Sequence, residues 1–254
     1  MTELCGDERL GYLRSRTVFE PGAGLRLDDS YRLAHLPLVA PSHPRVIAER
    51  AGAYYRMGRH ARVRSLVLPV PWPALAAAPA WRELDTALRR ASFAPKLAWD
   101  VFAQRRDRLH ATICGSPLPE RFDDARRREL AAMGPVTVAL RGLFSGNVNV
   151  GRLYLKVYPE MRGGANALGA IQRAIGRNET DLWVVGIHNL VDDLDAAEAS
   201  ELAALIVAWW DRPLLRLTVD RLWLLDACDD LVLDSEVADV IPLVASWAPQ
   251  PAGG

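Results

Sequence analysis

The chain has few cysteines and no excess of either charge. Its three cysteines, Cys5, Cys114 and Cys228, lie far apart, without a CxxC pair or a neighbouring pair of histidines. This spacing argues against a disulfide framework or a structural zinc site and favours a reducing compartment. The 31 basic and 31 acidic residues cancel, which argues against a protein that coats DNA or another nucleic acid. Contact with a polyanion therefore requires a local cluster of cations.

Long apolar runs are also absent. Residues 1–16 (MTELCGDERLGYLRSR) lack the apolar stretch of a signal peptide, and no later run is long enough to cross a bilayer. We therefore predict a cytoplasmic protein that does not contact membranes. Half of the 254 residues are hydrophobic, as in ordinary globular proteins, and the length suits one large domain or two small ones. The sequence leaves the oligomeric state open, with a monomer as the simplest expectation.

The chain changes character after its first sixty or so residues. Residues 1–61 are rich in proline and glycine and show no sustained period, which predicts an irregular N-terminal extension with short elements. Residues 62–247 alternate between regular helical and strand patterns and form the predicted main domain. Residues 248–254 (APQPAGG) are predicted to be a flexible tail.

Hydrophobic periodicity predicts the elements of the main domain. Apolar residues at helical spacing predict helices over 79–92, 121–133, 164–178 and 195–211. Alternating or β-branched runs predict strands over 62–71, 96–104, 108–116, 136–144, 151–159, 182–191, 214–227 and 230–244. The Gly- and Asn-containing segment 145–150 predicts a hairpin between two of these strands.

Mixed helices and strands with hairpins predict an α+β fold rather than a doubly wound parallel sheet. In each half of the main domain, a strand that carries a histidine is followed by a helix and then by further strands. This internal similarity predicts a bilobal architecture, in which two antiparallel-sheet lobes with outer helices face a central cleft.

Two of these strands carry a histidine motif. In the first, His110-Ala-Thr-Ile, the two-residue repeat of a strand puts His110 and Thr112 on one face. The second is His188-Asn-Leu-Val. With these motifs, residues 62–244 resemble the 2H phosphoesterase superfamily, whose members include 2′-5′ RNA ligase-like proteins and cyclic phosphodiesterases. The family has two His-x-Thr/Ser motifs on opposing lobes, and this chain has Leu190 where the second motif has its hydroxyl residue.

The resemblance implies a metal-independent phosphoesterase without a cofactor, which hydrolyses a cyclic or 2′-linked phosphodiester of a nucleotide or RNA terminus. His110 and His188 would then be the general acid and base, in an order that the sequence does not assign. Histidine suits both roles because its unperturbed pKa lies near ~6.5. Thr112 would donate a hydrogen bond to a phosphate oxygen. Because of Leu190, the alternative is a catalytically impaired protein of this fold that binds a nucleotide, an RNA end or a protein partner.

Further candidates follow from the parity of strand 151–159. Tyr154, Lys156 and Tyr158 share one face, so Lys156 could meet a phosphate and a tyrosine could stack on a base. Arg108 lies two residues before His110, so on a strand both share one face, and Arg108 is a further candidate for substrate binding. For each of these residues, an ordinary structural or solvated side chain is the competing interpretation. His35, His43 and His60 are predicted to be surface or capping residues.

Overall fold

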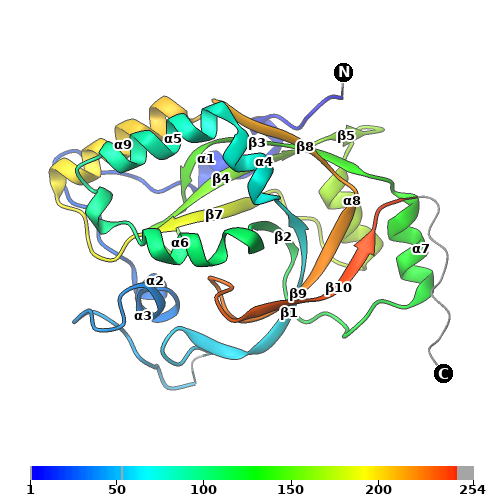
Figure 1. Ribbon diagram of the computed structural model, residues 1–254, viewed down its shortest axis with the longest axis horizontal. Coiled ribbons are helices and arrows are strands. Elements are labelled where there is room, and N and C mark those ends of the chain that lie inside the picture. Colours follow the sequence, from blue (N-terminus) through cyan, green and yellow to red (C-terminus); the bar gives the residue numbers. More distant parts are fainter. Residues whose placement is uncertain (1, 53, 245–254) are drawn as a thin grey trace.

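The central element of the protein is a sheet of eight strands, seen in a computed structural model that describes residues 2–52 and 54–244 (Figure 1). The strands follow the order β10-β9-β1-β2-β7-β4-β3-β8, and every neighbouring pair is antiparallel. Their bounds are β1 Arg59–Pro69, β2 His110–Cys114, β3 Val136–Ser145, β4 Arg152–Pro159, β7 Val184–Asn189, β8 Pro213–Val219, β9 Arg221–Asp229 and β10 Ser235–Pro242. Two short strands, β5 Met161–Arg162 and β6 Ala165–Asn166, form a separate sheet. The predicted α+β class with an antiparallel sheet is therefore confirmed.

The large sheet has two halves, which meet where β2 lies beside β7. Only one residue pair, Ala111 with Val185, is in register at this junction. The halves are also joined by a covalent link, since the predicted strand 214–227 breaks at Asp220 into β8 on one edge and β9 near the other. Because all eight strands belong to one sheet, the predicted bilobal arrangement of two separate sheets is not confirmed.

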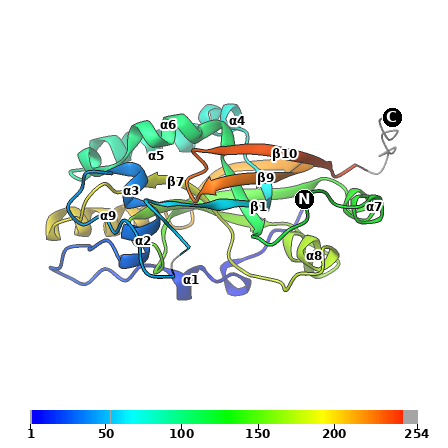
Figure 2. The ribbon, with the colours of Figure 1, turned by 90° about the horizontal axis from the view of Figure 1, so that it is seen from below.

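Helices cover the sheet on both sides. Figure 2 shows α4, α5 and α6 above the sheet and α1 and α8 below it. The helices are α1 Tyr12–Ser15, α2 Asp29–Ala34, α3 Leu36–Val39, α4 Trp72–Ala77, α5 Pro79–Arg90, α6 Trp99–Arg105, α7 Asp124–Ala132, α8 Ala167–Ala174 and α9 Ala196–Trp209. The apolar residues whose helical spacing predicted α5 are the ones that it buries, namely Trp81, Leu84 and Leu88. The acidic start of α9 is a capping box, in which Asp195 and Glu198 satisfy each other's backbone N–H groups.

The strand predicted over 96–104 is wrong, because this segment contains helix α6. Leu97, Trp99 and Val101 alternate with less apolar residues, which gave the strand pattern. In the structure the buried residues of the helix include Phe102 and Arg105, three positions apart, so a helical face packs on the sheet. Tertiary packing therefore overrides the local two-residue pattern.

The N-terminal extension packs against the sheet although its helices are short. Tyr12 is fully buried, and its hydroxyl lies 2.7 Å from the carbonyl oxygens of both Val157 and Trp183. Tyr31 is also fully buried, and its hydroxyl donates to the carbonyl oxygen of Leu190 at 2.6 Å. The division of the chain at residue 62 stays a prediction, and the predicted tail 248–254 lies outside the described residues.

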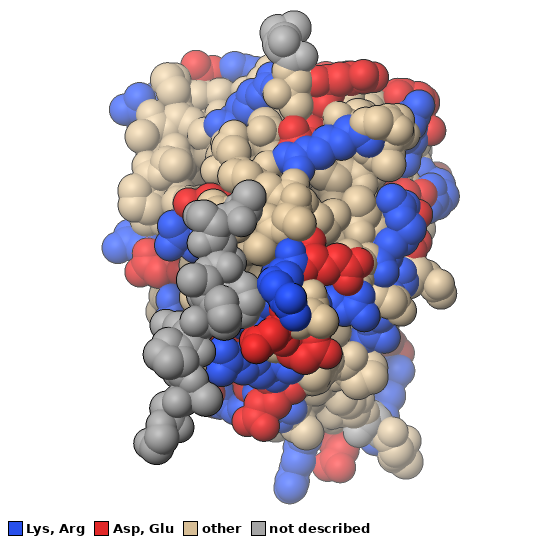
Figure 3. All heavy atoms as spheres, turned by 90° about the vertical axis from the view of Figure 1, so that its right-hand side faces the viewer, with Lys and Arg blue, Asp and Glu red and all other residues tan. Residues whose placement is uncertain are grey.

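The surface carries both signs of charge. Figure 3 shows Lys and Arg side chains interspersed with Asp and Glu side chains on the face that it presents. Within the described part of the chain, no helix has the length and apolar character needed to span a bilayer.

Candidate functional site

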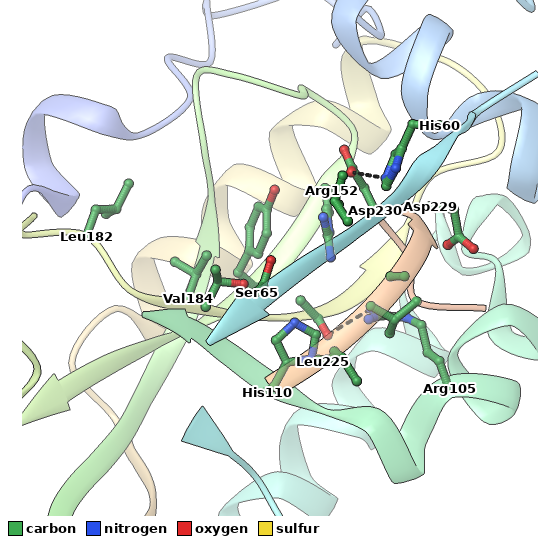
Figure 4. A pocket seen from close by; sticks show the side chains of 16 residues that line it. His60, Ser65, Arg105, His110, Arg152, Leu182, Val184, Leu225, Asp229 and Asp230 are labelled. Carbon is green, nitrogen blue, oxygen red and sulfur yellow. Dashed lines mark hydrogen bonds and ion pairs between the residues drawn. The ribbon is translucent and has the colours of Figure 1, made fainter. Parts of the chain in front are cut away.

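A cavity of about 380 Å³ lies where the two halves of the sheet meet (Figure 4). Side chains from β1, β2, β4, β7 and β9 line it, together with the last residue of α6 and the turn between β9 and β10. Its volume is in the range of pockets that hold small ligands. Of the residues selected from the sequence, His110, Thr112 and Tyr154 line this cavity.

His110 is the first residue of β2, and a hydrogen bond to the backbone fixes the tautomer of its ring. Its Nδ1 lies 2.7 Å from the carbonyl oxygen of Arg108. A carbonyl oxygen only accepts, so Nδ1 carries the hydrogen and Nε2 is left as an acceptor. Burial, with smaller contributions from Arg105 and Arg152, lowers the pKa of His110 to about 4. The imidazole is therefore neutral at pH 7, and Thr112 lies two residues further along the same strand with an exposed side chain.

Two arginines that the sequence analysis did not select point into the cavity. Arg105 ends α6 and is 3% exposed, and its Nη2 donates to the carbonyl oxygens of Gly186 at 2.8 Å and Ile187 at 3.1 Å. Arg152 begins β4, and its Nη1 lies 3.3 Å from Nε2 of His35. The Nε atoms of both arginines are buried without a hydrogen-bond partner. Within the described residues, neither guanidinium lies within 4.0 Å of a carboxylate.

The guanidinium of Arg105 keeps its charge although it is buried. Burial, with Arg152 as the next cause, lowers the pKa of Arg105 to about 9. This value still leaves Arg105 protonated at pH 7. Arg105 follows directly after the segment 96–104, for which the sequence predicts a strand, so its position at the end of a helix was not predicted. Arg152 is a single charged residue at the start of an alternating strand.

His35 is the hydrogen-bond partner of the Arg152 guanidinium. Its ring is fully buried and stacks on Tyr31, with 5.2 Å between the ring centroids. Burial and the two neighbouring arginines lower the pKa of His35 well below its usual value, so it is a neutral acceptor for Arg152. His35 is the C-cap residue of α2 and the N-cap residue of α3, so its prediction as a capping residue is confirmed, whereas a surface position is not. The four-residue spacing of Tyr31 and His35, which puts them on one helical face, was the available signal.

Acidic residues lie at the end of the cavity formed by the β9–β10 turn. Asp229 is buried and accepts hydrogen bonds from the backbone N–H groups of this turn. Asp230 accepts from the hydroxyl of Tyr55 at 2.7 Å and lies 3.4 Å from Nε2 of His60. Figure 4 shows His60 and Asp230 pointing toward each other. His60 was expected on the surface, and its side chain instead lines the cavity and is 3% exposed.

His188 does not reach the cavity. Its ring is fully buried against two residues of α6, with centroid distances of 4.5 Å to Trp99 and 4.7 Å to Phe102. Both ring nitrogens lack a hydrogen-bond partner, and burial lowers the pKa of His188 to about 3. Leu190 is also fully buried. The structure therefore does not bring the two motif histidines together.

Lys156, Tyr158 and Arg108 also lie outside the cavity. The Nζ atom of Lys156 is 3.7 Å from the ring centroid of Trp210 and 3.8 Å from a carboxylate oxygen of Asp7. The hydroxyl of Tyr158 donates to the carboxylate of Asp7 at 2.5 Å. Lys156 and Tyr158 therefore belong to one buried cluster beside the N-terminal extension. Arg108 contributes only its carbonyl oxygen to the site, through His110.

The cavity combines donors suited to an anion with acceptors, which include the carboxylates of Asp229 and Asp230 at its β9–β10 end. Arg105, Arg152 and Thr112 can donate to an anion, and Nε2 of His110 can accept a proton or a hydrogen bond. Within residues 2–52 and 54–244, no group of three or more His, Cys, Asp or Glu side chains has the arrangement of a metal site.

Comparisons with known proteins add little. No protein-family profile matches the sequence, and no curated protein matches it. The crystal structure of TT0787 of Thermus thermophilus matches 73% of this chain and 100% of that chain, with 14% sequence identity and a TM-score of 0.40. This likeness is too low to support an argument about fold or function.

Proposed function

We propose that the cavity binds the phosphate of a nucleotide or of an RNA end. The observation that carries the proposal is the pair of guanidinium groups of Arg105, which is buried, and Arg152, which is half-buried with a buried Nε; neither has a carboxylate partner within 4.0 Å in the described chain. A buried charge without a counter-charge costs several kcal/mol, and a bound anion would offset that cost. The planar fork of arginine matches the oxygens of a phosphate group.

The neighbouring groups support a phosphate ester rather than a simple anion. The acceptor atom Nε2 of His110 would repel a phosphate oxygen but would accept from a ribose hydroxyl beside the phosphate. The hydroxyl of Thr112 would donate to a phosphate oxygen. The choice of a nucleotide or RNA end also draws on the resemblance of His110-Ala-Thr112 to the first motif of the 2H phosphoesterases.

Hydrolysis is the second candidate function. The neutral imidazole of His110, with Nε2 unpaired, supports a general base that would act on a cyclic or 2′-linked phosphodiester without a metal ion. The burial of His188 leaves this reaction without its expected second histidine. Binding is for this reason the primary proposal, and catalysis in the manner of a 2H phosphoesterase is the further possibility that the same assay tests.

Binding can be measured by calorimetric titration with adenosine 2′,3′-cyclic monophosphate and adenosine 3′-monophosphate. Removing one charged hydrogen-bonding partner costs roughly 1.5–3 kcal/mol, so R152Q and R105Q should each weaken binding by at least about tenfold. The matched control is R108Q, because Arg108 has an arginine side chain outside the cavity. Wild-type protein that binds neither nucleotide at millimolar concentration would refute the proposal.

The same solutions test hydrolysis. Conversion of the cyclic nucleotide that disappears in H110A but persists in a variant of His188 would support a catalytic His110. Retained binding without conversion in the wild-type protein would assign the cavity to binding alone.

A further inference from the structure

We infer that the cavity selects a terminal phosphate monoester, a dianion, over a phosphodiester, and that Gly186 creates this preference by admitting Arg152. This inference rests on the proposed phosphate binding and specifies its ligand. It depends on three observations, which concern the space over Gly186, the charges of the groups around it and the partners of the nearby carboxylates.

Gly186 leaves room for a guanidinium beside His110. The register of Ala111 with Val185 makes Gly186 the cross-strand neighbour of His110 at the junction of β2 and β7. A Cβ atom on Gly186 would lie only 2.5 Å from Nη2 and 3.0 Å from Cζ of Arg152. Any larger residue would therefore displace this guanidinium.

Arg105 contacts the same glycine. Its Nη2 donates to the carbonyl oxygen of Gly186, where β2 no longer pairs with β7. The two cations are thus brought together around one residue that has no side chain. Like charges held this close repel each other, and an anion between them would remove that repulsion.

The two positive charges are not neutralised by the groups that contact them. Arg105 contacts backbone carbonyls, and Arg152 contacts the neutral ring of His35. His110 is neutral as well. At the Gly186 position a ligand therefore meets two guanidinium groups that have no counter-charge in contact with them, while the charge of Asp229 acts on Arg105 from beyond 4.0 Å.

The carboxylates of the cavity are occupied elsewhere. Asp229 accepts from the backbone N–H groups of residues 231, 233 and 234, and Asp230 accepts from Tyr55 and lies beside His60. Within the described chain, neither comes within 4.0 Å of a guanidinium of Arg105 or Arg152. A phosphate monoester carries close to two negative charges above its second pKa of about 6, whereas a diester carries one, so the monoester matches the two cations.

The test compares adenosine 3′-monophosphate with adenosine 2′,3′-cyclic monophosphate at pH 7.5 and pH 5.0 by calorimetric titration, with recovery of intact ligand checked. The monoester should bind at least about tenfold more tightly at pH 7.5, in keeping with one additional charge-assisted contact. At pH 5.0 the monoester loses its second charge, and the preference should shrink. The cyclic ligand stays a monoanion, so the change in its own affinity between the two pH values reports the effect of pH on the protein.

Substitution at Gly186 tests the structural cause. G186A should lower monoester affinity to that of the cyclic ligand. G115A is the matched control, because a Cβ on Gly115 would meet no atom within 4 Å. If G186A does not fold, R152Q provides the same comparison, and it should weaken the monoester more than the cyclic ligand.

The outcomes separate the inference from the proposed function. Equal binding of the two ligands, or tighter binding of the cyclic one, would overturn the preference and leave phosphate binding intact. Failure of both ligands to bind would overturn phosphate binding itself. A pH-independent preference would show that shape, and not the second charge, selects the ligand, which also contradicts the inference.

Discussion

Replacing His188 with phenylalanine should make the protein more resistant to acid. In the folded chain His188 stays neutral down to a pKa of about 3, whereas in the unfolded chain it takes up a proton near its usual pKa of 6.5. Between these values the unfolded state binds more protons, so the free energy of unfolding falls as the pH falls. Each pH unit in this window changes it by about 1.4 kcal/mol per histidine.

From pH 6.5 to pH 4.5, His188 accordingly removes roughly 3 kcal/mol of stability. The H188F variant should lack this loss. It also removes two buried ring nitrogens without partners and keeps an aromatic ring against Trp99 and Phe102, so its stability at pH 7.5 should equal or exceed that of the wild-type protein.

Urea unfolding of both proteins at pH 7.5 and pH 4.5 measures this difference. His110 also has a lowered pKa, but it is present in both proteins and cancels in the comparison. If wild-type protein and H188F lose the same stability on acidification, the neutral buried state of His188 is refuted.

Two other substitutions test buried positions outside the cavity. Burial lowers the pKa of Lys156 to about 8 from 10.5, so the unfolded state binds more protons between these values and stability rises with pH there. K156M should abolish about 2 kcal/mol of the increase between pH 7.5 and pH 9.5, and an unchanged increase in urea unfolding would contradict this. G142A should cost at least about 2 kcal/mol, because φ is +68° and a Cβ would lie 2.2 Å from the carbonyl oxygen of Trp210. Its thermal unfolding should be compared with that of G115A, and equal melting temperatures would refute the steric argument.

Local pattern was enough to predict the strand of the first motif. Alternation in 108–116 identifies β2, and its two-residue repeat puts His110 and Thr112 on one face. The α5 helix was predicted for the same reason, since its apolar residues recur at helical spacing. In both cases the pattern within the element decides which side chains are buried.

The position of His188 could not be predicted because it depends on α6. The segment 96–104 was assigned to a strand, and its Trp99 and Phe102 are the side chains that cover the ring of His188. One wrong element therefore produced two errors, a missing helix and a histidine expected in a cleft. Strand parity fixes the face of a residue but not whether another element covers that face.

The arginine pair could not be predicted because it is formed by tertiary structure alone. Arg105 and Arg152 come from a helix and a strand that are distant in the sequence, and they meet over Gly186 on a third element. His35 comes from the N-terminal extension, which the sequence analysis separated from the main domain. No motif connects these four residues, so only the packed chain reveals the site.

The short link at Asp220 limits how the protein can respond to a ligand. The strands on either side of this residue belong to opposite halves of the sheet, and its carbonyl oxygen also accepts from the N–H of Leu243 at 2.7 Å. The one-residue connection keeps the end of β8 next to the start of β9, so the two halves cannot come apart at this point. The halves are therefore tied at two places, namely this covalent link and the junction of β2 with β7 beside the cavity.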